Sequence, residues 1–467
     1  MAGETIENRT FDEIVVGDKA SVSRTLTQDD IQLFARVSGD VNPAHVDADY
    51  AAGDMFHHVI AHGLWGGALI SSVLGTELPG PGTIYLSQNL RFLRPVAVGD
   101  TITATVTVIE KQEEHHVLVL ACLCTNQQNE TVIVGTAEVK APTERVSRPR
   151  AVLPEVRIIR HDRYRHLIER ASGGPALPTA VVHPCDEAAM RAVGEASRMG
   201  LILPILVGPQ VKIAAAAQAA NVDLSVFRLV DTPHSHAAAA RGGALVRAGE
   251  AAILMKGSLH TDELMAAVVA DDSGLKTERR ISHAYLMDVP GYPRPIIITD
   301  AAINIAPDLA EKADIVRNAI GLAKALGIDN PRVAILSAVE TVNPKLRSTL
   351  DAAALCKMAD RGQILGGILD GPLAFDNAVS PEAVREKGII SPVAGLADIL
   401  VVPDLEAGNM LAKQLTFLSG ADAAGIVLGA RVPIILTSRA DSERTRIASA
   451  AVGVLLARRA VGQAKAA

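Results

Sequence analysis

The pattern of apolar and polar residues changes character between the first 140 residues and the rest of the chain. Strict alternation, typical of strands with one exposed face, covers 83–93, 100–110, 115–125 and 130–140. An apolar run rich in small residues at 61–74 predicts one helix that is buried on most faces. The predicted arrangement is an α+β domain in which the sheet wraps the helix.

After residue 178 the alternation gives way to continuous apolar runs. Such runs are typical of strands buried on both faces of a largely parallel sheet, and they occur at 202–208, 251–254, 295–299, 332–336, 364–369, 398–402 and 433–436. Helical segments such as 187–199 lie between them. We therefore expect an α/β three-layer domain of two lobes with a cleft between them.

The two patterns are separated by a stretch without period. Residues 141–155 are rich in proline and arginine and show neither strand nor helix spacing. A chain of 467 residues also exceeds one ordinary core. We predict a first domain over 1–142, a linker over 143–158 and a second domain over 159–467.

Composition excludes several classes of protein. With 49% hydrophobic and 21% charged residues the chain is globular rather than disordered. A net charge of −7 argues against nucleic acid as the main partner. The four cysteines are scattered and form neither a disulfide framework nor a metal-ligand set, so we expect reduced thiols and no bound metal. No signal peptide or membrane-spanning run is present, and we expect a cytoplasmic protein.

One short stretch of the first domain places a carboxylate and an imidazole together. Asn42 is a good helix N-cap and Pro43 suits the first helical position, so a helix is expected to begin there. Asp40 then lies on the incoming loop and His45 in the first turn. Facing one pocket, the two side chains can orient a water and remove its proton. The alternative is a junction whose Asp and His only satisfy nearby backbone groups.

Gly63 lies at the expected start of the buried helix. Backbone N–H groups there have no intrahelical partner, and the helix dipole is positive. Such an N–H can stabilise negative charge that develops on a carbonyl oxygen.

In the second domain, polar residues collect in loops at the strand ends. They include Lys256 after one strand, Ser391 and Gly395 in a loop, Asn409 after Pro403-Asp404, and Ser438-Arg439 with Asp441 after the last strand. Hydroxyls, backbone N–H groups and a guanidinium together suit a phosphate or pyrophosphate. Each motif alone also fits a helix cap with a surface arginine. No glycine-rich nucleotide fingerprint is present.

The first domain resembles the MaoC-type (R)-specific enoyl-CoA hydratases of hotdog fold. The motifs are Ser38-Gly39-Asp40-x-Asn42-Pro43-x-His45 followed by Ala61-His62-Gly63. The resemblance implies that Asp40 and His45 activate the water added to a trans-2-enoyl thioester, and that the Gly63 N–H holds the carbonyl oxygen. Asn42 and Ser71 would contribute to substrate binding. It also implies a dimer or higher homo-oligomer.

In the order of these loop motifs, the second domain resembles the phosphate acetyl/butyryltransferase family. The best-matching block runs from Gly371 to Ser442. The resemblance implies that phosphate attacks an acyl-CoA, with Ser438 bonded to the carbonyl or the leaving sulfur and Arg439 and Arg241 holding phosphate or CoA. Acetyl-type members carry an aspartate seven residues after the serine, where this chain has Thr445. Asp441 is a possible substitute base.

Together the two resemblances imply a bifunctional enzyme. It would hydrate trans-2-enoyl-CoA to (R)-3-hydroxyacyl-CoA and transfer acyl groups between CoA and inorganic phosphate. CoA thioesters and phosphate would be substrates, with no tightly bound cofactor. The alternative is a hydratase whose second domain only binds acyl-CoA as a regulatory or scaffolding module.

Overall fold

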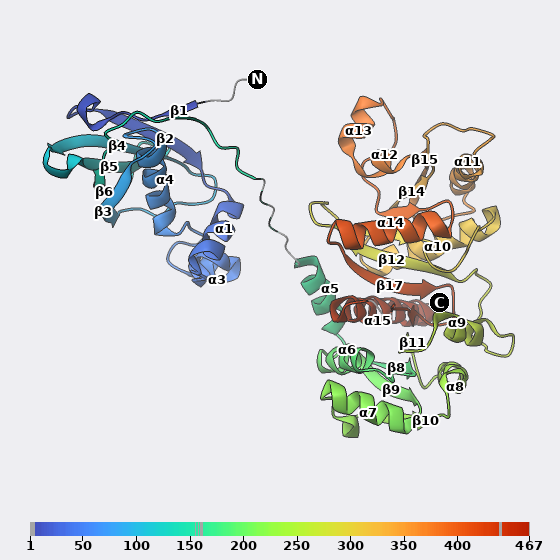
Figure 1. Cartoon of the computed structure of the whole chain (residues 1–467). Coiled ribbons are helices and arrows are strands. Elements are labelled where there is room, and N and C mark those ends of the chain that lie inside the picture. The colour runs from blue at the N-terminus through green and yellow to red at the C-terminus, as the bar shows by residue number, and fades with distance from the viewer. Residues whose placement is uncertain (1–4, 155, 157, 159–161, 439–440, 467) are drawn as a thin grey trace. The chain divides into compact units, whose positions relative to one another are not determined.

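The computed structural model describes residues 5–154, 156, 158, 162–438 and 441–466 (Figure 1). The chain divides into two compact units, 1–158 and 159–467. Each unit has its own hydrophobic core, and each is described separately below.

The first unit is one antiparallel sheet with a buried helix. Its five main strands lie in the order β2-β4-β5-β6-β3, and a two-stranded sheet pairs β1 with β7. The elements are β1 Thr5–Glu7, η1 Phe11–Glu13, β2 Lys19–Thr25, α1 Gln28–Ser38, α2 Pro43–Val46, α3 Ala48–Gly53, α4 Gly63–Thr76, β3 Ile84–Phe92, β4 Thr101–Gln112, η2 Glu114–His116, β5 Val117–Thr125, β6 Thr131–Lys140 and β7 Ser147–Pro149.

The helix α4 forms its core against this sheet because its small residues allow close approach. A Cβ on Gly66 would collide with the side chain of Ile133 on β6. Residues 101–108 of β4 alternate between partly exposed and buried, and the buried positions, Ile102 and Val106 among them, face the helix side of the sheet. The predicted α+β arrangement with a sheet around one helix is confirmed.

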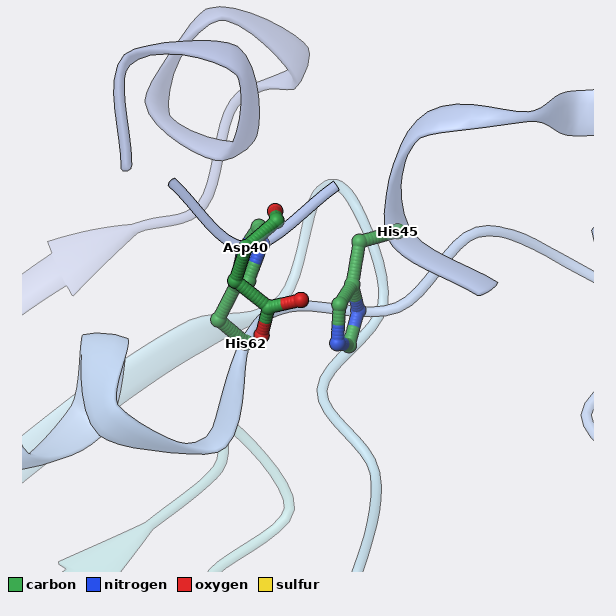
Figure 2. A group of neighbouring side chains, drawn as sticks. All are labelled: Asp40, His45 and His62. Carbon is green, nitrogen blue, oxygen red and sulfur yellow. Dashed lines mark hydrogen bonds between the residues drawn. The ribbon is translucent and has the colours of Figure 1, made fainter. Parts of the chain in front are cut away.

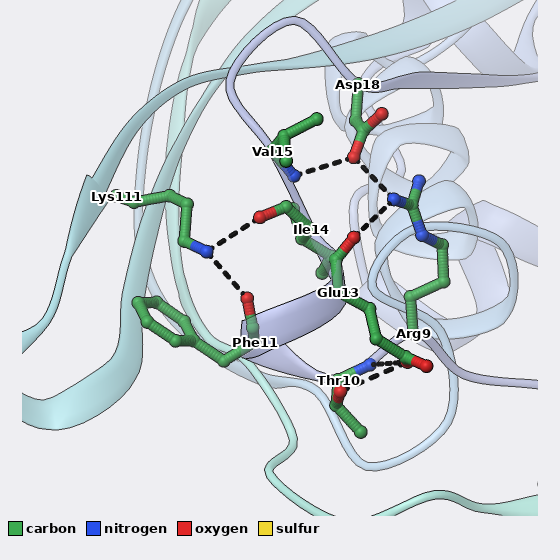
Figure 3. Close-up of polar contacts among 8 residues, drawn as sticks. All are labelled: Arg9, Thr10, Phe11, Glu13, Ile14, Val15, Asp18 and Lys111. Atoms are coloured by element: carbon green, nitrogen blue, oxygen red, sulfur yellow. Dashed lines mark hydrogen bonds and ion pairs between the residues drawn. The ribbon is translucent and has the colours of Figure 1, made fainter.

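A polar cluster ties the short helix η1 to the sheet (Figure 3). The Lys111 ammonium donates to the carbonyl oxygens of Phe11 and Ile14 at 2.8 and 2.7 Å, and it lies 4.3 Å from the centre of the Phe11 ring. The Asp18 carboxylate accepts from the Val15 N–H at 2.8 Å and from the Arg9 guanidinium at 2.6 Å. These contacts fix the segment that covers one end of the core.

The cluster predicts an acid-sensitive contribution to stability. The Val15 N–H and then the Arg9 guanidinium lower the pKa of Asp18. A carboxyl whose pKa is lowered on folding contributes stability above its unfolded pKa of about 3.9, and this is lost as pH falls through the folded pKa. We expect Asp18→Asn to lower the free energy of unfolding at pH 7 by about 1 kcal/mol. Urea unfolding of the wild type and of Asp18→Asn at pH 7 and pH 3 measures this. The difference in free energy of unfolding between the two proteins is expected to be smaller at pH 3. A difference of the same size at both pH values would contradict the prediction.

The second unit alternates strands and helices. Its elements are α5 Asp162–Ser172, β8 Leu177–Val182, α6 Glu187–Arg198, β9 Ile202–Gly208, α7 Gln210–Ala220, η3 Leu224–Val226, β10 Arg228–Asp231, α8 Ser235–Arg247, β11 Ile253–Lys256, α9 Thr261–Val269, β12 Ser282–Asp288, β13 Ile296–Thr299, α10 Leu309–Ala325, β14 Arg332–Leu336, α11 Arg347–Asp360, β15 Ile368–Leu373, α12 Phe375–Val379, α13 Pro381–Glu386, β16 Ile399–Val401, α14 Leu405–Leu418, β17 Asp422–Leu428, β18 Ile434–Ile435 and α15 Glu443–Ala466.

Its strands form one sheet in the order β10-β9-β8-β11-β18-β17-β12-β13-β16-β14-β15. The first five strands in this order, from β10 to β18, pair in parallel, and so do the last four, from β13 to β15. Between these two groups, β17 and β12 pair antiparallel with each other and with their outer neighbours β18 and β13. Carboxyl ends of parallel strands meet at one edge of a sheet, where α/β domains bind ligands. The α/β domain predicted from the sequence is confirmed.

The strands β10, β12 and β17 are absent from the sequence prediction, and β15 begins four residues later than its predicted run. In β12 the apolar pattern is broken by the buried polar residues Ser282 and His283. The Asn318 amide donates to the Ser282 hydroxyl at 2.9 Å. A hydrogen bond from a distant helix therefore satisfies a buried polar residue of the strand. The apolar pattern along the chain does not reveal such a partner.

Candidate active sites

The loop before α2 positions the Asp40 carboxylate. Asn42 is the N-cap of α2, its side-chain oxygen accepts from the Ala44 N–H at 3.2 Å, and Pro43 occupies the first turn. The Asp40 carboxylate in turn accepts from the Asn42 N–H at 3.1 Å. The predicted helix start at Pro43 is confirmed, and the carboxylate is held at the incoming end of the helix.

Three side chains converge beside this loop (Figure 2). Asp40, His45 and His62 each offer an oxygen or nitrogen atom within 4.8 Å of the others. The rings of His45 and His62 lie 4.0 Å apart between centroids, tilted by 35°. Asp40 is exposed, His45 half-buried and His62 buried, so the group lies where a buried interior opens to solvent.

Backbone carbonyls select the tautomer of both histidines. The Nδ1 atom of His45 lies 2.9 Å from the carbonyl oxygen of Ile60, and the Nε2 atom of His62 lies 3.0 Å from that of Asp40. A carbonyl oxygen only accepts, so each of these nitrogens carries a proton when the ring is neutral. The His45 Nε2 lone pair is thereby left to accept a proton, whereas His62 holds the backbone of Asp40.

Two members of the group, His45 and His62, line a cavity of about 300 Å³ whose other walls are largely apolar. His45, His62 and Gly63 line it together with Trp65 and Phe92. Gly63 is the first residue of α4 and lies against the Phe92 ring, which is 3.1 Å from where a Cβ on Gly63 would be. The Trp65 N–H of this first turn donates to the His62 carbonyl at 2.9 Å, whereas the N–H of Gly63, as the first helical residue, has no acceptor within the helix. An acyl chain and its thioester carbonyl fit this combination of an apolar wall and a polar helix start.

The two predicted substrate-binding residues of the first unit lie apart from this lining. Asn42 caps α2 as described. Ser71 is exposed on α4, two turns beyond Gly63, and does not line the cavity. Substrate contacts for both stay predictions.

His62 is expected to act as a positioning residue. His62→Leu removes the donor to the Asp40 carbonyl and is expected to lower kcat for hydration about a hundredfold, since small misplacements of reacting groups cost this much. His62→Gln retains a donor at the Nε2 position and is expected to recover most of the rate. Steady-state kinetics with crotonyl-CoA separates kcat from KM, and a change in KM alone would contradict the positioning role.

In the second unit, two buried cations converge on the backbone that follows β18. The Lys256 ammonium donates to the Thr437 carbonyl at 3.0 Å, and the Arg446 guanidinium donates to the Ser438 carbonyl at 3.0 Å. Both cations are 3% exposed. The Asp441 carboxylate accepts from the Ser438 N–H at 2.5 Å. The structure thus brings Lys256, Ser438 and Asp441 to one short segment, and their roles toward a substrate stay predictions.

Burial raises the pKa of Asp441, an effect that the Ser438 N–H and then the Arg446 and Lys256 charges oppose. A carboxyl in this state is a better proton acceptor than an ordinary surface aspartate. Thr445 lies in the first turn of α15, with its N–H donating to the Ser442 hydroxyl at 3.1 Å. Thr445 therefore takes part in the hydrogen bonds at the start of α15, and its hydroxyl does not ionise as the aspartate of acetyl-type members would.

The other predicted residues of this domain have local roles in the structure. The Ser391 hydroxyl accepts from the N–H groups of Val393 and Ala394, and the Asn409 amide donates to the Ala301 carbonyl at 3.2 Å. Gly395 has φ +73° and packs on Pro381. Arg241 is exposed on α8, and Arg439 lies outside the described residues. Substrate roles for these residues stay predictions.

Sequence reasoning missed Arg446. This arginine lies four residues beyond the serine-rich end of the quoted motif, inside a helix, where a cation usually faces solvent. Its guanidinium instead contacts the carbonyl oxygens of Ser438 and Asp441, at 3.0 and 3.3 Å. The signal available in the sequence was its place one turn after Ser442, on a helix that follows a buried strand.

Comparison with known families identifies both units. A family model described as MaoC like domain matches residues 16–121, and one described as phosphate acetyl/butaryl transferase matches residues 235–454. The phosphate acetyltransferase of Rhizobium meliloti is 63% identical over 297 residues, which are 64% of this chain and 94% of that protein. The chain belongs to the phosphate acetyl/butyryltransferase family. It carries a MaoC-like domain ahead of the transferase domain.

Solved structures include similar molecules for each unit. A branched-chain phosphotransacylase from Enterococcus faecalis V583 is 30% identical, covers 60% of this chain and 99% of its own, and has a TM-score of 0.54. An (R)-hydratase from Pseudomonas aeruginosa is 45% identical, covers 33% of this chain and 99% of its own, and has a TM-score of 0.32. Among the described helices, none combines the length and apolar character that a bilayer crossing requires.

Proposed function

We propose that this chain performs two reactions on CoA thioesters at two separate active sites. The first domain hydrates trans-2-enoyl-CoA to (R)-3-hydroxyacyl-CoA, and the second exchanges an acyl group between CoA and inorganic phosphate. The observation that carries the proposal is the match of both families together with a polar group of the expected chemistry in each unit. A second domain that only binds acyl-CoA is disfavoured by its 63% identity to a phosphate acetyltransferase.

In the hydration step, a water between Asp40 and His45 loses its proton to the His45 Nε2 atom. The water oxygen adds to the β-carbon of the enoyl group as the double-bond electrons move toward the thioester carbonyl. The Gly63 N–H then stabilises the enolate oxygen, and a proton returns to the α-carbon. The Ile60 carbonyl supports this assignment, because it holds the His45 proton on Nδ1 and leaves Nε2 as the base.

In the transfer step, a phosphate oxygen forms a bond to the thioester carbonyl carbon, and the bond from that carbon to the CoA sulfur then breaks. The products are an acyl phosphate and CoA thiolate. Phosphate is largely dianionic near neutrality and is already nucleophilic, so orientation supplies much of the acceleration. Ser438 donates its hydroxyl to the reacting carbonyl or the sulfur, Asp441 accepts a proton where one is released, and Arg439 and Arg241 bind anionic groups.

The family chemistry uses CoA and phosphate as substrates, and we propose that no tightly bound cofactor takes part. We also propose a cytoplasmic location, a reducing compartment in which Cys122, Cys124, Cys185 and Cys356 would stay free thiols. Assembly into a dimer or higher oligomer through the first domain is likewise a proposal. Gel filtration with light scattering measures it.

The experiment that tests the assignment follows both reactions in the wild-type chain. Loss of the enoyl absorbance of crotonyl-CoA, with chiral analysis of the product, reports hydration. Release of free CoA from acetyl-CoA and butyryl-CoA, with and without phosphate, reports transfer. We expect (R)-3-hydroxybutyryl-CoA and phosphate-dependent release. Hydration without any phosphate-dependent release would favour a binding role for the second domain.

A further inference from the structure

The second unit contains an open groove with an unusual concentration of positive charge. Its volume is about 780 Å³, and its walls come from α10, α15, the 277–279 segment, the 363–365 segment and the loop that joins β17 to β18. Five basic side chains and one acidic side chain line it, namely Arg279, Arg317, Lys324, Arg431, Arg459 and Glu278. Because the whole chain carries a net charge of −7, this groove is a local reversal of the prevailing charge.

The groove is separate from the site at Ser438. Ser438 follows the carboxyl end of β18, whereas the groove is formed by Arg431, Val432 and Pro433 before its amino end. Along α15, the active-site side includes Arg446 and the groove side includes Arg459. Thirteen helical residues at 1.5 Å each separate these two positions by about 20 Å. The groove lining includes neither Ser438 nor Lys256, Asp441 and Arg446, which contact the Ser438 segment.

Three of the five cations are available to a ligand. Arg317 is paired with Asp314 at 2.7 Å, and Arg459 donates to the Lys324 carbonyl at 3.1 Å. Within the described ranges, the charged ends of Arg279, Lys324 and Arg431 have neither a hydrogen bond nor an ion pair. The Lys324 ammonium lies against Gly366, where any Cβ would collide with it. The glycine thus leaves room for the ammonium beside the groove.

The remaining wall is apolar. Ile320, Leu365, Val432 and Leu456 line it, and Leu365 is 74% exposed although it is a large aliphatic residue. An exposed leucine beside unpaired cations suits a ligand that has both an anionic part and a flat apolar part. An inorganic anion would bind the cations but leave the apolar wall without a contact.

We propose that this groove binds a nucleoside diphosphate group, with the diphosphate on Arg279, Lys324 and Arg431 and the base against the Leu365 wall. Such a group is carried by free nucleotides and by the nucleotide end of CoA. The volume falls within the range of about 300–1,000 Å³ that is usual for small-molecule sites. This binding is independent of both proposed reactions, and the residues that carry it belong to neither active site.

The test is isothermal titration of the full-length protein with ADP. The variant Arg279→Ala/Lys324→Ala/Arg431→Ala removes the three available cations, and Lys345→Ala/Arg361→Ala/Lys413→Ala removes the same charge from exposed positions outside the groove. We expect the first variant to raise the Kd for ADP about tenfold or more, since each cation contributes a charged hydrogen bond. The second is expected to change it by less than about twofold. Equal binding by the wild type and the groove variant would overturn the proposal.

Further titrations identify the ligand class. We expect pyrophosphate to bind the wild-type groove about tenfold or more weakly than ADP, because it lacks the base that covers the apolar wall. Equal affinities would overturn the nucleotide assignment and leave a simple anion site. Displacement of ADP by CoA in the wild type, absent in the groove variant, identifies the nucleotide end of CoA as a ligand. Displacement of ADP by ATP but not by CoA identifies a free nucleotide as the ligand. Displacement by CoA and displacement by ATP alone both support the proposal.

Discussion

Replacing Asp40 by asparagine is expected to lower the rate of crotonyl-CoA hydration about a thousandfold, within the range that general acid-base catalysis supplies. The amide keeps the shape of the carboxylate and can still accept from the Asn42 N–H, which holds Asp40 at 3.1 Å in the wild type. What it loses is the negative charge that, in the proposed mechanism, polarises the attacking water beside His45. The expected defect therefore lies in kcat, with KM nearly unchanged.

The matched control for this prediction is Asp49→Asn. Asp49 is an exposed aspartate on α3, outside the group formed by Asp40, His45 and His62. It is expected to retain full hydration activity. Phosphate-dependent CoA release is expected to be unchanged in both variants, because their substitutions lie in the first unit. A loss of both activities in Asp40→Asn would indicate misfolding and contradict a purely chemical role.

Replacing Ser438 by alanine is expected to lower phosphate-dependent CoA release about a hundredfold. Removing one hydrogen-bond donor aimed at a reacting carbonyl typically costs this much. The fold of the segment is expected to survive, because its position depends on backbone contacts. Arg446 donates to the Ser438 carbonyl, and Asp441 accepts from the Ser438 N–H, and alanine retains both groups.

The control for this variant is Ser419→Ala, at the exposed end of α14. It is expected to leave release unchanged. Free thiol is measured with a chromogenic reagent from acetyl-CoA and butyryl-CoA at saturating phosphate. Release that persists at the wild-type rate in Ser438→Ala would place the reacting carbonyl elsewhere in the domain.

Local signals in the sequence were sufficient to predict the two helix starts of the first site. Asn42 and Pro43 fix a helix start by cap chemistry that involves only neighbouring residues, and the structure has that helix. The same holds for Gly63 at the start of α4. These features are predictable because the groups that satisfy one another lie within a few positions along the chain.

Features that depend on distant partners were not predictable in the same way. His62 matched a motif, but its role follows from the Asp40 carbonyl twenty-two residues away. Lys256 reaches the segment that Arg446 also contacts, although its partner Thr437 lies 181 residues further along the chain. The antiparallel strands β12 and β17 likewise depend on pairing across the middle of the sheet. Only the folded chain reveals which of these polar residues are buried and paired.

The central claim is that two independent active sites act on CoA thioesters in one chain. The most direct measurement is of both rates, crotonyl-CoA hydration and phosphate-dependent CoA release, in the same preparations of the wild type, Asp40→Asn and Ser438→Ala. We predict that Asp40→Asn loses hydration alone and Ser438→Ala loses release alone. A wild type that releases no CoA in the presence of phosphate, or a single substitution that abolishes both rates in a folded protein, would contradict the claim.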